Sequence, residues 1–127
     1  HAGFAALRNA CTMNVGVRIK PRPQSPALAR DVARVREIFE TGPVRLGGPW
    51  LAGPEFTAAD AFFAPVAFRV RTYGLDLGTG QAWVDHVLAH PAMLDWERQA
   101  LAETWREASH EAELAAAGEI VADYRAG

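Results

Sequence analysis

Residues 56–73 read FTAADAFFAPVAFRVRTY and decide the fold. Thr57 and Asp60 stand three residues apart, which is the spacing of a capping box, a device that pairs the free backbone N–H groups at a helix start. An acidic side chain is also favoured near the positive end of the helix dipole. Phe56 and Ala61 occupy the two positions of a hydrophobic staple. This stretch therefore predicts a helix with a firmly defined beginning.

The helix body is marked by residues 61–68, which carry no polar side chain for more than two turns. A helix that is apolar all round is buried on every side, and this run is too short to span a membrane. We expect an all-α fold of five to six helices packed around residues 57–73.

The N-terminal flank predicts two further helices. In residues 1–16, Phe4, Leu7 and Cys11 recur at helical spacing. Residues 17–26 contain three prolines, which predicts a linker without a helix. A second helix should begin at a Ser25 cap and end at Gly42-Pro43.

The remaining chain predicts a glycine-rich connection at 43–55 and three more helices. The connection lacks the Lys-Ser/Thr pair of a phosphate-binding loop, so we expect a loop anchored in the core by Trp50. Short helices should run over 83–88 and from Pro91 onward. A terminal helix is predicted by the stripe Leu114, Ala117, Val121 and Tyr124, and no strand is expected.

The composition limits the function. The chain has 127 residues, enough for one domain with a core, and a net charge of −2 that argues against nucleic-acid binding. Charge is uneven, because residues 1–30 hold five basic and no acidic side chains, whereas residues 95–127 hold eight acidic and three basic ones. This pattern is typical of solvated helix faces, or of a basic rim beside an anionic ligand.

The cellular setting follows from the single cysteine. Cys11 has no partner for an internal disulfide, and no run reads as a signal peptide or a membrane span. We therefore expect a cytoplasmic protein without a membrane association. Because His1 heads an expected helix and no initiator Met precedes it, we also expect that residues 1–127 are one domain of something longer.

The central stretch resembles the buried helix in the C-terminal domain of glutathione transferases, where a device similar to Thr57–Asp60 nucleates the helical domain. Pro65 has a counterpart in the zeta-like (maleylacetoacetate-isomerase-like) members. The resemblance extends over about residues 1–108. It includes the sequence segments His1-Ala2-Gly3-Phe4, Met13-Asn14, Trp50-Leu51-Ala52-Gly53 and His90-Pro91-Ala92-Met93.

The resemblance implies a function. In this family a thioredoxin-like domain, absent from this chain, binds glutathione as co-substrate and activates its thiol. The helical domain supplies an apolar wall for a small electrophilic substrate, for which Phe4, Arg8, Phe68 and Arg71 are the candidate residues here, and the family forms homodimers. We expect no catalytic residue in this chain. The alternative is a non-catalytic docking or assembly module with the same fold.

Other candidate chemistry is weaker. His86 and His90 lie four residues apart, as a metal pair on one helix face would, but no third ligand accompanies them, so we expect surface or capping histidines and no metal. Ser109 beside His110 is no triad signal. Cys11 is expected to pack in the core as an inert thiol.

Arg69 and Arg71 are the only charges in the last turns of the central helix. They are explained by emergence to solvent or by the favourable position of cations at a helix C-terminus. The alternative is an anchor for an anionic substrate, since a guanidinium offers a rigid two-pronged donor to a carboxylate.

Overall fold

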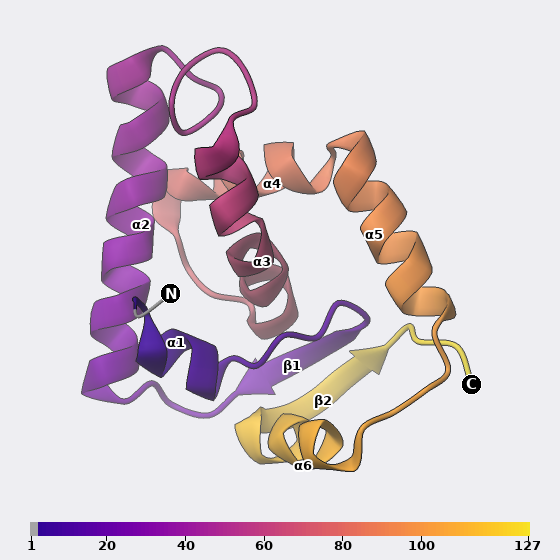
Figure 1. Ribbon diagram of the computed structural model, residues 1–127. Helices are drawn as coiled ribbons and strands as arrows, with labels where there is room; N and C mark the ends of the chain where they lie inside the picture. The colour runs from indigo at the N-terminus through magenta and orange to yellow at the C-terminus, as the bar shows by residue number, and fades with distance from the viewer. Residues whose placement is uncertain (1–2) are drawn as a thin grey trace.

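The computed structural model describes residues 3–127 and shows a mostly helical fold, as predicted (Figure 1). His1 and Ala2, which belong to the predicted first helix, lie outside the described residues. Six α-helices and a two-stranded sheet follow the order α1 (Ala5–Ala10), β1 (Val17–Pro21), α2 (Pro26–Leu46), α3 (Ala58–Tyr73), α4 (Gln81–Leu88), α5 (Pro91–Ala102), α6 (Ala108–Ala117) and β2 (Gly118–Asp123), with a 3-10 turn, η1 (Gly78–Gly80), before α4.

Helix α3 occupies the middle of the fold, between α2 and α5 in Figure 1. Its start is organised by Asp60, whose side chain is fully buried. One carboxylate oxygen of Asp60 accepts the Thr57 backbone N–H at 2.9 Å and completes the predicted capping box. The other oxygen accepts Leu51 N–H and Trp83 Nε1–H, each at 2.9 Å. The capping residue therefore also ties the preceding loop and α4 to α3.

The core surrounds the C-terminal half of α3, where Phe68, Val70, Thr72 and Tyr73 are all buried. Phe68 and Tyr73 are fully buried, and Phe39 of α2 stacks on Trp83 of α4 with ring centroids 4.2 Å apart. The prediction that residues 61–68 are buried on every side is wrong, because the Phe62 side chain is 52% exposed.

Helix α2 begins as predicted and runs further than predicted. Ser25 Oγ accepts the Leu28 N–H at 3.1 Å, and Pro26 occupies the first turn. The helix passes through Pro43 and ends at Leu46, because Gly47 (φ 76°) provides the left-handed residue that closes it. The predicted end at Gly42-Pro43 is therefore wrong by one turn.

A sheet stands where a linker and a terminal helix were predicted. Strand β1 pairs antiparallel with β2, from Val17 opposite Asp123 to Pro21 opposite Gly118. Val17 and Ile19 point into the core and are at most 4% exposed, whereas β2 forms the outer strand. Of the predicted terminal stripe, Leu114 is buried in α6, but Val121 lies in β2 and is 59% exposed.

Helix α1 is shorter than predicted, whereas α5 begins at the predicted residue. Helix α1 covers Ala5–Ala10 alone, and the chain leaves it at Cys11. Helix α5 begins at Pro91, where His90 Nδ1 accepts the Ala92 N–H at 3.1 Å, so the predicted capping histidine is confirmed. Trp50 is 9% exposed, as expected of a core anchor. Among the described helices, none is long and apolar enough to cross a bilayer.

Replacing Asp60 tests its role in folding. We expect Asp60→Ala to lower the free energy of unfolding by about 3 kcal/mol, because it leaves two buried donors unpaired at a cost of about 1–3 kcal/mol each. Urea denaturation followed by circular dichroism measures this. Asp85→Ala is the control, since Asp85 is exposed and accepts one hydrogen bond, from Gln81. Equal stability of the two variants would contradict the assigned role.

The start of β2 offers a second test. A Cβ atom on Gly118 would overlap the carbonyl oxygen of Lys20 and would lie 2.9 Å from Cα of Pro21. Because these are backbone atoms of the paired strand, Gly118→Ala should cost about 1–3 kcal/mol of stability, the range typical of overpacking. The neighbouring exposed change Glu119→Ala should have little effect. A fully stable Gly118→Ala protein would show that β2 does not pair with β1 in this register.

Candidate functional site

A pocket of about 380 Å³ lies between α1, α3 and α5, and we call it the apolar pocket. Most of its lining is hydrocarbon or aromatic ring, with two arginines and no carboxylate among the described residues. It is lined by Phe4, Leu7, Arg8, Met13, Phe62, Phe63, Pro65, Val66, Arg69 and Trp96. Small-molecule sites usually have this character, a largely apolar cleft with a few polar groups that orient the ligand.

Aromatic rings form the walls of the apolar pocket. Phe63 packs edge-to-face with Phe4 at 6.1 Å and with Phe62 at 5.2 Å between ring centroids. On the other side, Trp96 of α5 packs edge-to-face against Phe68 at 4.8 Å and remains 39% exposed. Phe62 and Trp96 thus present accessible ring surface on rigid helices, which is suited to holding a flat apolar molecule.

Two guanidinium groups line the same pocket from different helices. Arg69 Nε donates to the Cys11 carbonyl oxygen at 2.8 Å, and Arg8 Nε donates to the Gly3 carbonyl oxygen at 3.1 Å. Burial lowers the pKa of Arg69, and the nearby charge of Arg8 acts in the same direction. Each side chain is therefore anchored by its Nε, close enough to the other for their charges to interact.

The four predicted substrate-binding residues separate into two pairs. Phe4 and Arg8 line the apolar pocket together. Phe68 is fully buried beneath Trp96. Arg71 pairs with Glu97 of α5 at 3.2 Å, and its guanidinium lies over the Phe68 ring, so it neither emerges freely nor lines this pocket. A role in binding substrate stays a prediction for all four.

The final set of sequence-based candidates left out several residues of the pocket, although Arg69 had been considered together with Arg71. Phe62, Pro65, Val66 and Arg69 all line it from α3. They stand at positions i, i+3, i+4 and i+7, which share one helix face. The signal was therefore present in the sequence, but because the whole run is apolar, the sequence did not show which face lines the pocket.

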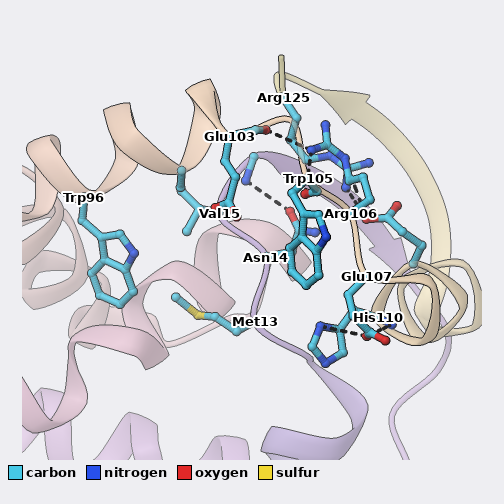
Figure 2. Close-up of a pocket in the computed structure, with 13 residues that line it drawn as sticks. Met13, Asn14, Val15, Trp96, Glu103, Trp105, Arg106, Glu107, His110 and Arg125 are labelled. Atoms are coloured by element: carbon cyan, nitrogen blue, oxygen red, sulfur yellow. Dashed lines mark hydrogen bonds and ion pairs between the residues drawn. The ribbon is translucent and has the colours of Figure 1, made fainter. Parts of the chain in front are cut away.

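A polar pocket of about 220 Å³ adjoins the apolar one and shares Met13 and Trp96 with it. Figure 2 shows these two side chains on one side and the charged groups on the other. Arg125 pairs with Glu111 at 2.6 Å and with Asp123 at 2.7 Å, and it lowers the pKa of Asp123 to about 2. The charges of Arg125, Glu111 and Asp123 are thus paired with one another, and these ion pairs hold the C-terminal segment in place.

His110 lines this polar pocket, and it forms no nucleophilic pair with its neighbour Ser109. Glu107 accepts a hydrogen bond from Ser109 Oγ and lies 3.4 Å from His110 Nδ1. No hydrogen bond joins Ser109 to His110 within the described part of the chain. His86 packs on the Trp50 ring at 4.3 Å. In residues 3–127, no three His, Cys, Asp or Glu side chains gather as metal ligands do.

The fold is a small helical domain with the apolar pocket between α1, α3 and α5. The family model described as "Glutathione S-transferase, C-terminal domain" matches residues 24–108, so the chain belongs to this family. No curated protein and no solved structure matches the chain significantly. The match begins after α1 and β1, so the resemblance read in residues 1–23 and the likeness to the zeta-like members both stay predictions.

Cys11 tests the prediction of an inert thiol. Its side chain is 1% exposed, and burial raises its pKa to about 11. At pH 8 we expect a disulfide-exchange reagent to label the folded protein slowly and the urea-unfolded protein fast, because the thiolate is the nucleophile.

The same pKa predicts a dependence of stability on pH. Because the folded state holds the proton more tightly than the unfolded state, the contribution of Cys11 is complete below pH 9 and is lost as the pH rises toward about 11. Wild-type protein should therefore lose more stability than Cys11→Ala over this interval. In the labelling experiment described above, fast reaction of the folded protein at pH 8 would contradict the buried placement of Cys11.

Proposed function

We propose that this chain is the electrophile-binding domain of a glutathione transferase, acting in thiol conjugation or in glutathione-dependent isomerisation. The apolar pocket carries the proposal, because it offers accessible rings of Phe4, Phe62 and Trp96 on helices held by the core. Glutathione would be bound mainly by a thioredoxin-like domain, and this chain would supply the opposite wall of the cleft.

The chemistry of the pocket fits binding and orientation. Its lining includes no described carboxylate, imidazole or thiol that could take a proton from glutathione. Burial raises the pKa of Cys11 and of Tyr73, which makes both groups poorer anions near neutral pH. The contribution of this domain would be to hold the electrophile in register with a thiolate formed elsewhere, and such positioning can supply a large share of a rate enhancement.

Assembly forms part of the same proposal. A homodimer of the complete protein, in a cytoplasmic setting, would follow the family. A docking or assembly module without catalysis is the competing function. The two differ in what precedes His1 in the coding sequence: a thioredoxin-like domain with an early Ser, Tyr or Cys supports the enzyme, and its absence would favour the module.

Kinetics of the protein with that domain test the proposal. With 1-chloro-2,4-dinitrobenzene, a neutral aromatic electrophile, Phe62→Ala should raise KM about tenfold, because burying a phenylalanine ring is worth about 1.5–3 kcal/mol. Residues 1–127 alone should show no conjugation.

The matched control is Val44→Ala, which removes an apolar side chain that is 82% exposed near the end of α2. It should leave KM unchanged. An unchanged KM in Phe62→Ala would remove the apolar pocket from the reaction, and turnover by residues 1–127 alone would reveal a thiol-activating group within this domain.

A further inference from the structure

We propose that the apolar pocket selects electrophiles that carry an anionic group, with Arg8 and Arg69 holding a carboxylate while the aromatic walls hold a flat apolar body. This inference rests on the proposed function and specifies its substrate class. It places the anion at Arg69, whereas the sequence had suggested Arg71.

The guanidinium groups of Arg8 and Arg69 are open where a carboxylate would bind. In each, Nε is used by a backbone carbonyl, and the two terminal nitrogens form no hydrogen bond with any residue of the described chain. Neither arginine has an ion-pair partner among residues 3–127. A carboxylate prefers such paired, coplanar donors because it accepts two parallel N–H bonds.

Two other arginines with partly buried side chains have carboxylate partners. Arg71 pairs with Glu97, and Arg125 pairs with Glu111 and Asp123. Arg18 lies over the Tyr124 ring, with its carbon 5.1 Å from the ring centroid. Arg8 and Arg69 have no carboxylate partner among residues 3–127, and the charge of Arg8 contributes to the lowered pKa of Arg69, so an anion bound between them would relieve this repulsion.

The positions of the two arginines are also fixed in advance. The bond from Arg69 to Cys11 joins α3 to the end of α1, and α1 itself carries Arg8. A ligand would therefore meet donors that need little ordering, which is the condition under which a few polar contacts add affinity. The pocket volume of about 380 Å³ suits a bicyclic aromatic body with a short acidic arm.

A matched pair of probes separates charge from shape. Naphthalene-1-acetate and naphthalene-1-acetamide differ in charge and share nearly the same outline. Isothermal titration of residues 1–127 should show the acetate binding about tenfold more tightly than the amide at low salt, as expected for charge-assisted hydrogen bonds. Raising the salt concentration should reduce this preference.

Three variants locate the preference. Arg8→Gln and Arg69→Gln should each weaken acetate binding about fivefold to tenfold and leave amide binding within about twofold. Arg30→Gln, which removes an exposed charge from α2, is the control and should change neither. Arg8 is exposed, so its variant remains informative if loss of the Arg69–Cys11 bond unfolds the protein.

The outcomes distinguish this inference from the function on which it rests. If both probes bind equally and Phe62→Ala weakens both, the apolar pocket is a binding site without charge selection, and the inference fails alone. If the acetate is preferred but Arg8→Gln and Arg69→Gln behave like Arg30→Gln, the preference arises elsewhere and the inference also fails. If neither probe binds, both proposals fail.

Discussion

The fold depends on one buried carboxylate, that of Asp60. It receives hydrogen bonds from the start of α3, from the loop at Leu51 and from the Trp83 indole of α4. An ionised group is costly to bury, and it is tolerated here because several donors surround it. Since α3 packs on α4 and β1 and reaches α2 and α5 through its side chains, the position of its first turn determines where its faces lie, and hence where the core and the apolar pocket form.

Helix α3 divides its surface between these two tasks. One face carries Phe68 and Tyr73 into the core, and another carries Phe62 and Arg69 to the apolar pocket. A binding site on a rigid helix is more precisely placed than one on a loop. The same helix that stabilises the fold can therefore present ring surface and charge at a fixed spacing, and the accessible Phe62 ring is the feature that ordinary core packing does not explain.

The sequence predicted what local rules determine. The caps at Ser25, Thr57 and His90 were readable because cap chemistry depends on neighbours in the chain. The β1–β2 pairing was missed because Val17 pairs with Asp123, and a local sequence pattern does not identify a partner strand so far away in the chain. In the pocket, Phe4 and Arg8 were predicted but Arg69 was not preferred to Arg71. Two residues separate these arginines, about 200° around a helix, so the choice required knowing which face lacked a neighbour.

The β1–β2 pairing also determines when the fold can be completed. During synthesis on the ribosome, β1 emerges well before its partner, because α2 to α6 lie between the two strands in the chain. Until then Val17 and Ile19 belong to an unpaired edge, the kind of surface on which chains aggregate. The helices can form from short-range contacts, whereas this pairing requires two strands that are far apart in the chain to meet, which is entropically slow. The edge of β1 therefore stays unprotected in the nascent domain until β2 has been synthesised.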